Sequence, residues 1–203
     1  MTADLPVAAG FERVAIPNAD VFYLPRLELR RSDAELLRRL VAEVPWRAET
    51  VMMWGRPIRQ PRLTAWFGDP GSDYTYSGLQ LAPIPWTALL RDIKTRVEEA
   101  TGWSFNSVLV NYYRDHRDSI GYHSDDEPEL GERPRIASLS LGAARTFVMK
   151  PKTSAADPVR LRLGSGSLLL MAGETQKHWR HGVPKENQAC GPRINLTFRT
   201  IVR

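Results

Sequence analysis

Two stretches in the first half of the chain repeat their apolar residues at the 3.6-residue period of an α-helix. The first follows the sequence SDAE at 32–35, which has the form of a capping box, and its apolar positions are Leu36, Leu37, Leu40 and Val41. The second begins near Pro85, and its apolar positions are Trp86, Leu89, Leu90, Ile93 and Val97. We expect the first helix to end before Pro45 and the second to end at Gly102.

Beyond Gly102 the pattern changes to short runs that often alternate apolar and polar residues, separated by turn residues. The runs are 105–113, 136–141, 145–150, 159–163, 167–172 and 193–202. Residues 1–25 are expected to be irregular or to form short strands. Two helices followed by at least six strands predict a mainly β, α+β fold, an antiparallel barrel or double sheet with both helices packed outside.

The connections 51–60 and 67–78 combine aromatic residues with arginines. Trp54, Tyr74 and Tyr76 stand in these segments, together with Arg56 and Arg59. Exposed aromatic side chains beside arginines are unusual in passive connectors. The alternative is that the aromatic side chains anchor the loops to the core.

Composition and charge narrow the class of protein. The chain has 203 residues, of which 42% are hydrophobic, so a single domain over 1–203 with a substantial core is expected. No apolar run approaches the ~20 residues of a membrane-spanning helix, and no signal peptide is predicted. Cys190 is the single cysteine, which excludes an internal disulfide and a cysteine-rich zinc site. The formal charge of +5 is compatible with an anionic partner, and we expect a cytoplasmic (in a eukaryote, nuclear) monomer.

The tripeptide His123-Ser124-Asp125 offers two metal-ligand types two residues apart. In an extended chain such residues point to one face, so both side chains could reach one ion. A second histidine from a distant strand would complete a two-histidine, one-carboxylate set, which leaves open positions on iron(II). His181 is the candidate and His178 its rival, although ordinary surface or buried histidines are the simpler interpretation.

The strand at 193–199 reads RINLTFR and alternates strictly. Its polar face would carry Arg193, Asn195, Thr197 and Arg199. Two arginines with an asparagine and a threonine between them could bind a dicarboxylate, because arginine forks bind carboxylates bidentately. The alternative is a half-buried strand with a solvated polar face. Asn111 and Tyr113 share one face of another strand, where they could line the same pocket or bond within the sheet.

Four ordered motifs together resemble the AlkB family of iron(II)- and 2-oxoglutarate-dependent nucleic-acid demethylases. They are NYY at 111–113, HSD at 123–125, HGVP at 181–184 and RINLTFR at 193–199, the last being the most specific. The likeness runs from about Pro61 to the C-terminus. It is greatest to the animal-type duplex-DNA repair branch, because PR at 61–62, YTYSG at 74–78 and HSDDE at 123–127 also match it.

The resemblance implies a double-stranded β-helix (jelly roll) and a complete set of cofactor residues. Fe(II) would be held by His123, Asp125 and His181, the histidine that precedes a Val-Pro pair being favoured over His178. 2-Oxoglutarate would be held by Asn111, Tyr113, Arg193, Asn195 and Arg199. The implied reaction is oxidative demethylation of 1-methyladenine- or 3-methylcytosine-type bases in DNA, with release of formaldehyde, succinate and CO₂.

The resemblance also implies nucleotide-recognition loops within 45–80. Tyr76 and His123 would sandwich a flipped base, and Glu127 would accept a hydrogen bond from its amino group. Trp54 would fill the gap that the base leaves, and Tyr74 and Arg62 would contact the substrate, Arg62 through a phosphate as for Arg56 and Arg59. Two alternatives remain: the same cofactor chemistry on RNA or a protein side chain, and a non-catalytic jelly-roll binding module.

Overall fold

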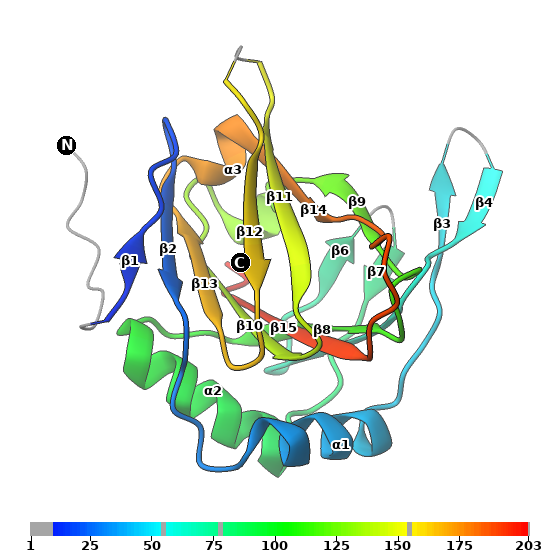
Figure 1. The fold of residues 1–203 in the computed structure, drawn as a ribbon. Coiled ribbons are helices and arrows are strands. Elements are labelled where there is room, and N and C mark those ends of the chain that lie inside the picture. Colours follow the sequence, from blue (N-terminus) through cyan, green and yellow to red (C-terminus); the bar gives the residue numbers. More distant parts are fainter. Residues whose placement is uncertain (1–9, 54–55, 77–78, 154–155, 203) are drawn as a thin grey trace.

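Two antiparallel sheets face each other in the computed structural model, and two helices cover the outer side of the larger sheet (Figure 1). The structure describes residues 10–53, 56–76, 79–153 and 156–202. The prediction of a mainly β, α+β fold is therefore confirmed, and the paired sheets form the expected jelly roll.

The larger sheet supplies the base of the molecule. Within the described residues its spatial order is β1 (Glu12–Arg13), β2 (Asp20–Leu24), β13 (Leu168–Ala172), β10 (Ile136–Gly142), β15 (Arg193–Arg199), β8 (Ser107–Tyr113) and β5 (Leu63–Gly68). The C-terminal strand β15 lies in the interior of this sheet and pairs with β10 on one side and β8 on the other. Six residues of β15 pair with β10, so its polar positions are fixed on both sides.

The smaller sheet closes the jelly roll. Its described strands are β12 (Val159–Leu163), β11 (Arg145–Pro151), β14 (Trp179–Val183) and β9 (Ile120–His123), in that spatial order. A core of apolar side chains fills part of the space between the sheets, with Leu169 and Met171 from the larger sheet and Phe147, Met149 and Trp179 from the smaller one. The sequence pattern did not indicate β5, β9 or β14. The strands β9 and β14 are short and contain polar residues.

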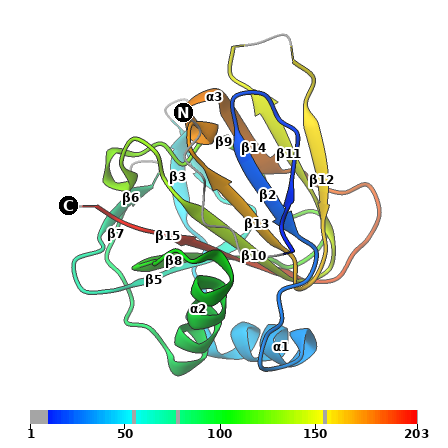
Figure 2. The same ribbon diagram turned by 90° about the vertical axis from the view of Figure 1, so that its left-hand side faces the viewer.

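The helices α1 (Asp33–Glu43) and α2 (Ala88–Thr101) pack side by side beneath the larger sheet (Figure 2). Ser32 caps α1 by accepting a hydrogen bond from the Glu35 amide at 3.2 Å, and the helix ends before Pro45 as predicted. α2 begins after the cap Thr87 and ends at Gly102, whose φ of 71° is the left-handed conformation expected of a terminating glycine. Their apolar stripes bury against the sheet.

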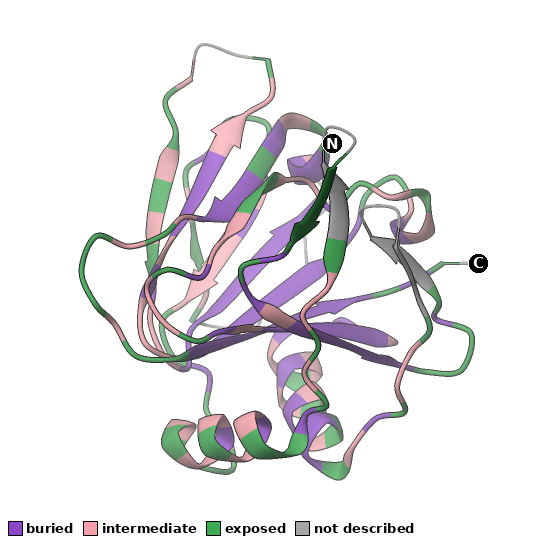
Figure 3. Ribbon diagram, turned by 90° about the vertical axis from the view of Figure 1, so that its right-hand side faces the viewer, coloured by how far each residue is buried: buried purple, intermediate pink, exposed green. Residues whose placement is uncertain are grey.

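All residues of β13 and of β15 are buried, but their side chains enter different parts of the core. Figure 3 shows that the strands above the two helices are largely buried (purple). Every residue of β13 is buried, because its alternate side chains enter the helix-side core and the core between the sheets. In β15, Ile194, Leu196 and Phe198 enter the helix-side core, and the polar residues occupy the opposite face. That polar face is buried rather than solvated, which removes the simpler interpretation of the RINLTFR strand.

Much of the 45–80 segment, expected as loops, forms strands. It contains the hairpin of β3 (Thr50–Met53) and β4 (Arg56–Arg59), the strand β5, and a second hairpin of β6 (Tyr74–Tyr76) and β7 (Leu79–Leu81). Figure 1 shows the β3–β4 hairpin standing apart from the two sheets, at the right of the view. Trp54 lies outside the described residues; Tyr74 and Tyr76 are placed at the ends of β6, and their side chains are not described.

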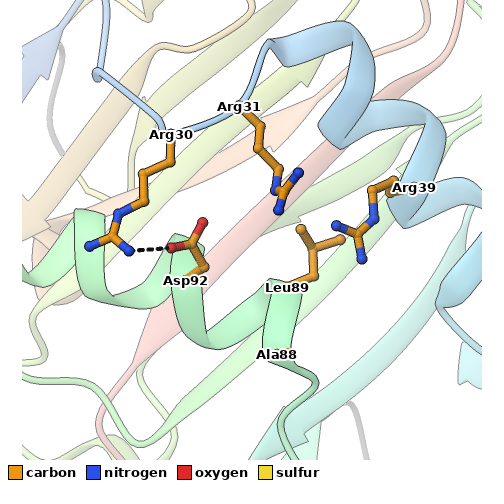
Figure 4. A pocket seen from close by; sticks show the side chains of 6 residues that line it. All are labelled: Arg30, Arg31, Arg39, Ala88, Leu89 and Asp92. Atoms are coloured by element: carbon orange, nitrogen blue, oxygen red, sulfur yellow. Dashed lines mark ion pairs between the residues drawn. The ribbon is translucent and has the colours of Figure 1, made fainter.

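A hollow of about 540 Å³ lies between α1, α2 and the segment that precedes α1 (Figure 4). Its lining consists of Arg30, Arg31, Arg39, Ala88, Leu89 and Asp92. Each arginine has a carboxylate partner, Asp92 at 3.2 Å, Glu35 at 2.7 Å and Glu43 at 2.6 Å respectively. Because these charges are matched, we assign no ligand to the hollow. Among the described residues, no helix has both the length and the apolar character needed to cross a membrane.

Candidate active site

The candidate site lies between the two sheets, where the polar face of β15 meets the strands β8, β9 and β14. The cavity there is lined by four residues of β15, by Asn111 and Tyr113 of β8, and by His123 and His181. The sequence therefore predicted most of its polar wall. Apart from Ser138, the remaining lining is apolar and includes Leu109, Phe147 and Met171, which restricts water around the polar groups.

His123, Asp125 and His181 converge on one point. One ligand atom from each lies within 4.8 Å of the other two. His123 and His181 are direct cross-strand partners in the β9–β14 pair, which brings their rings to a centroid distance of 4.4 Å. Asp125 follows β9, and its two carboxylate oxygens lie 3.7 Å from Nε2 of His123 and 3.9 Å from Nε2 of His181.

His123 has the tautomer that a metal ligand needs. Its Nδ1 lies 2.9 Å from the carbonyl oxygen of Gly121. Because a carbonyl only accepts, Nδ1 carries the proton and Nε2 presents its lone pair towards Asp125. The expectation that His123 and Asp125 share one face is thus confirmed, with the ring orientation fixed by the strand itself.

Asp125 is held from two sides. Its backbone amide donates to Oε1 of Gln176 at 3.0 Å, and its Oδ1 accepts from Nη2 of Arg199 at 2.9 Å. Burial opposes ionisation, but the charge of Arg199 and the two histidines outweigh it and hold the pKa of Asp125 at about 2. The carboxylate is therefore ionised at neutral pH, and its buried Oδ2 has no hydrogen-bond donor among the described residues.

Burial keeps His181 neutral. The pKa of this imidazole is lowered to about 3, mainly by burial and next by the neighbouring His123. The opposing effect of Asp125, which raises the pKa, is smaller than either. The Nδ1 atom is buried and has no hydrogen-bond partner in the described part of the chain. A neutral imidazole is the form that binds a metal, so His181 is in the binding-competent state without loss of a proton.

The rival ligand His178 is excluded by position. His178 ends the short helix α3 (Thr175–His178) and its Nε2 pairs with Glu174 at 3.3 Å. The chain turns from α3 into β14 between the two histidines. Only the second of the two reaches Asp125.

These three side chains fit a single Fe(II) ion. Two neutral nitrogen donors and one ionised carboxylate form the facial set typical of non-haem iron, and it leaves coordination positions open. The buried oxygen of Asp125 without a donor supports this assignment, because such an atom is costly unless a cation or donor meets it.

Arg193 supplies the cationic end of the cavity. Its side chain is 1% exposed, its Nη2 donates to Oγ of Ser140 at 3.0 Å, and Nε and Nη1 lack acceptors among the described residues. Burial lowers the pKa of this guanidinium, more than the adjacent Tyr113 raises it. A carboxylate placed here would satisfy the remaining N–H groups, which fits the distal end of 2-oxoglutarate.

The amide of Asn195 orders the polar face between the arginines. Its Nδ2 donates to Oγ of Ser138 at 2.7 Å and to the Leu139 carbonyl at 3.1 Å. Thr197 donates to Oδ1 of Asn195 at 2.9 Å. The side chain thus contributes mainly by holding the strand's polar groups in place.

The expectation of a surface phosphate contact at Arg62 is not met. This side chain is 3% exposed, and its Nε donates to Oδ1 of Asn111 at 2.8 Å. β5 pairs with β8, so the residue just before β5 lies against the cavity rather than against solvent. Arg62 therefore orients Asn111, whereas Arg56 and Arg59 on β4 are exposed.

Sequence reasoning missed two residues that support the site. Gln176 holds the Asp125 backbone, and Arg145 lies buried beneath Tyr113. Neither belongs to a motif with ligand spacing, so only the fold reveals their role. Glu127 stands two residues after Asp125 and precedes the 3₁₀ turn Pro128–Leu130, which places its backbone beside the site.

Comparisons with known proteins agree with this geometry. The sequence pattern of the 2OG-Fe(II) oxygenase superfamily matches residues 20–199. Human alpha-ketoglutarate-dependent dioxygenase alkB homolog 3 is 47% identical over 175 residues, which cover 82% of this chain and 60% of the relative. Mouse DNA oxidative demethylase ALKBH2 is 45% identical over 159 residues, covering 75% of this chain and 66% of the relative.

A plant relative and a solved structure extend the comparison. DNA oxidative demethylase ALKBH2 of Arabidopsis thaliana is 33% identical over 211 residues, covering 91% of this chain and 67% of the relative. The structure of OsALKBH1 superposes with a TM-score of 0.65 at 20% identity, covering 93% of this chain and 100% of that one, which shows a shared fold. The chain spans 60–63% of the length of the alkB homolog 3 proteins that it matches.

Proposed function

Because the chain belongs to the AlkB family of the 2OG-Fe(II) oxygenase superfamily, we propose that it removes N-methyl groups oxidatively from alkylated DNA bases. The observation that carries the proposal is the convergence of His123, Asp125 and His181 in one cavity. The same cavity contains the buried Arg193, whose Nε and Nη1 have no hydrogen-bond acceptor among the described residues. The expected products are the restored base, formaldehyde, succinate and CO₂.

The residues divide into two binding tasks. His123, Asp125 and His181 would hold Fe(II), and Arg193 and Arg199 would bind the two ends of 2-oxoglutarate, with Asn111 and Tyr113 along its side. Iron with 2-oxoglutarate and dioxygen supplies the oxidising power when bound. The chain's contribution is geometric: Arg199 holds Asp125 ionised and oriented, and the apolar lining excludes water.

Base recognition is assigned to the hairpins of the 45–80 segment and to the residues after β9. A methylated base in a duplex must leave the stack before its methyl group can reach the iron. We place Tyr74, Tyr76, His123 and Glu127 around the extruded base and Trp54 in the gap. The exposed Arg56 and Arg59 on β4 are suited to phosphates. The similarity to DNA oxidative demethylases of mouse and Arabidopsis thaliana supports a nucleic-acid substrate.

The test is formaldehyde release from an oligonucleotide that carries one 1-methyladenine, with Fe(II), 2-oxoglutarate and air. We expect one molecule of formaldehyde to be released for each restored adenine. The restored adenine is measured by mass spectrometry of the digested strand. His123→Ala is the matched control, since it removes one ligand. Equal rates for wild type and His123→Ala would refute the proposal. The same lesion in single-stranded DNA, duplex DNA and RNA then ranks the substrates.

A further inference from the structure

Arg145 is a buried cation that lies outside the cavity lining. It opens β11, and its side chain is 1% exposed. Its Nη1 donates to the Asp115 carbonyl at 3.0 Å, and its Nη2 donates to the carbonyls of Asp118 at 2.7 Å and Pro184 at 2.8 Å. One guanidinium thus joins the 115–118 segment to Pro184, which lies 66 residues beyond Asp118 in the sequence.

The three carbonyls flank the two strands that carry the histidines. Asp115 and Asp118 belong to the connection into β9, and Pro184 directly follows β14. β9 and β14 pair through His123 with His181 and through Ile120 with Val183, with an irregular register between these pairs. The irregularity leaves few paired residues to align β9 with β14, and Arg145 binds the backbone on both sides just beyond the Ile120–Val183 end.

The same guanidinium packs against the dicarboxylate end of the cavity. Its carbon Cζ lies 5.5 Å from the ring centre of Tyr113, and Cζ of Arg193 lies 5.2 Å from that ring centre. The ring of Tyr113 therefore contacts two cations, and Arg145 limits where this ring and hence Arg193 can lie. Glu186 balances the charge only partly, at 3.7 Å from Nε, because it also binds Arg162 at 2.7 Å.

Stability alone does not account for this arrangement. Taking a guanidinium out of water is expensive, and an apolar side chain of similar volume often stabilises a core as well as a buried ion does. A buried fork that joins separate strands is instead suited to fixing one geometry.

We propose that Arg145 is a positioning residue of the active site. It holds β9 and β14 in the register in which His123 lies opposite His181. It also holds the ring of Tyr113 against Arg193. The proposal rests on the proposed function, since it assigns 2-oxoglutarate to the cavity. Arg145 touches neither metal nor cosubstrate, and acts by keeping the site assembled before they bind.

The variants Arg145→Met and Arg145→Lys distinguish the effect of the carbonyl hydrogen bonds from the effect of the positive charge. Methionine keeps an unbranched chain and removes all three carbonyl bonds; lysine keeps the charge without the planar fork. We expect the 2-oxoglutarate dissociation constant to rise by about 10- to 100-fold for Arg145→Met and by less for Arg145→Lys, the range for residues that orient ligands. The dissociation constant is measured by anaerobic calorimetry in the presence of Mn(II).

Two controls distinguish positioning from general destabilisation. Arg162→Met removes an exposed arginine that binds the same Glu186, and it should leave 2-oxoglutarate affinity within about twofold. Val148→Ala makes a cavity at a fully buried β11 position and should lower Tm without a comparable loss of affinity. If Val148→Ala weakens binding as much as an Arg145 variant of equal Tm, the proposal is overturned.

A second readout uses the metal-free protein. Amide hydrogen exchange of β9 and β14 should speed up by about tenfold or more in Arg145→Lys, while exchange of β13 stays at its wild-type rate. Unchanged exchange in β9 and β14 would overturn the proposal even if binding weakens. Failure of wild type to bind 2-oxoglutarate would instead refute the proposed function, so the two failures are distinguishable.

Discussion

Nη2 of Arg199 lies 2.9 Å from Oδ1 of Asp125, and both side chains are buried, at 3% and 0% exposure. The pair joins the last residue of β15 in the larger sheet to the end of β9 in the smaller one, so it links the two halves of the jelly roll at the site. Arg199 thereby fixes one oxygen of the carboxylate and leaves the other directed at His181. The proposed metal and cosubstrate sites share this arginine.

Replacing Arg199 by lysine should therefore weaken both ligands together. Lysine keeps the positive charge but cannot reproduce the planar fork, so Asp125 loses its fixed orientation. We expect Mn(II) affinity to fall by about 10- to 100-fold, measured by electron paramagnetic resonance titration. Arg26→Lys, which changes an exposed pair with Asp33, is the control and should bind as wild type does. Full Mn(II) affinity in Arg199→Lys would contradict the shared role.

Arg193→Met should reduce cosubstrate binding without loss of stability. Arg193 is buried with two N–H positions lacking acceptors, a costly state in the ligand-free protein. We expect Tm to stay equal or rise, while the 2-oxoglutarate KM increases by about 10- to 100-fold, the equivalent of one or two charge-assisted hydrogen bonds. Thermal melts and steady-state kinetics measure the two effects. A variant with lowered Tm and an unchanged KM would indicate a purely structural arginine.

The two neighbouring histidines allow a matched comparison of metal binding. His181→Ala removes a nitrogen that lies 3.9 Å from Asp125. His178→Ala removes a nitrogen at the end of α3 that pairs with Glu174, the residue before that helix. We expect loss of Mn(II) binding by at least about 100-fold in the first and a change within about twofold in the second. Equal losses of Mn(II) affinity in the two variants would contradict the assignment of His181, rather than His178, as the metal ligand.

Local pattern was sufficient to predict the helices α1 and α2 and the strands β8, β10, β11, β12, β13 and β15. The capping box at Ser32 and the terminating Gly102 marked the helix ends, because their causes lie within a few residues. The alternation of β15 predicted its two faces for the same reason. β9 and β14 were missed because they are four or five residues long and their polar residues serve the site, so neither shows an apolar pattern.

The site was predictable only as far as its motifs reach. His-x-Asp and the polar face of β15 placed the ligand types, and the family resemblance selected His181. The burial of Arg62 and the bridging bonds of Arg145 arise from strand pairing between distant segments. An arginine read from sequence is expected at the surface; only the tertiary structure shows that these two support the cavity.

The metal-free protein should lose stability on mild acidification, and His181 should account for part of the loss. Burial, together with the neighbouring His123, lowers the pKa of His181 from 6.5 to about 3, and burial also lowers that of His123. Between pH 6.5 and 3 the unfolded chain therefore takes up protons that the folded chain refuses, so the free energy of unfolding falls as the pH falls. Asp125, with its pKa lowered from 3.8 to about 2, adds a loss in the same direction below pH 3.8.

The measurement is Tm of the chelator-treated protein at constant ionic strength from pH 7.5 to 4.5, well above the window of Asp125. Wild type should melt at progressively lower temperature across this range. His181→Gln cannot take up the proton, so its profile should be flatter, and His123→Gln/His181→Gln flatter still. Parallel profiles for wild type and the double variant would show that these imidazoles titrate alike in the folded and unfolded chains. In that case they would not be held neutral by burial, and the site would not be pre-set to receive a metal.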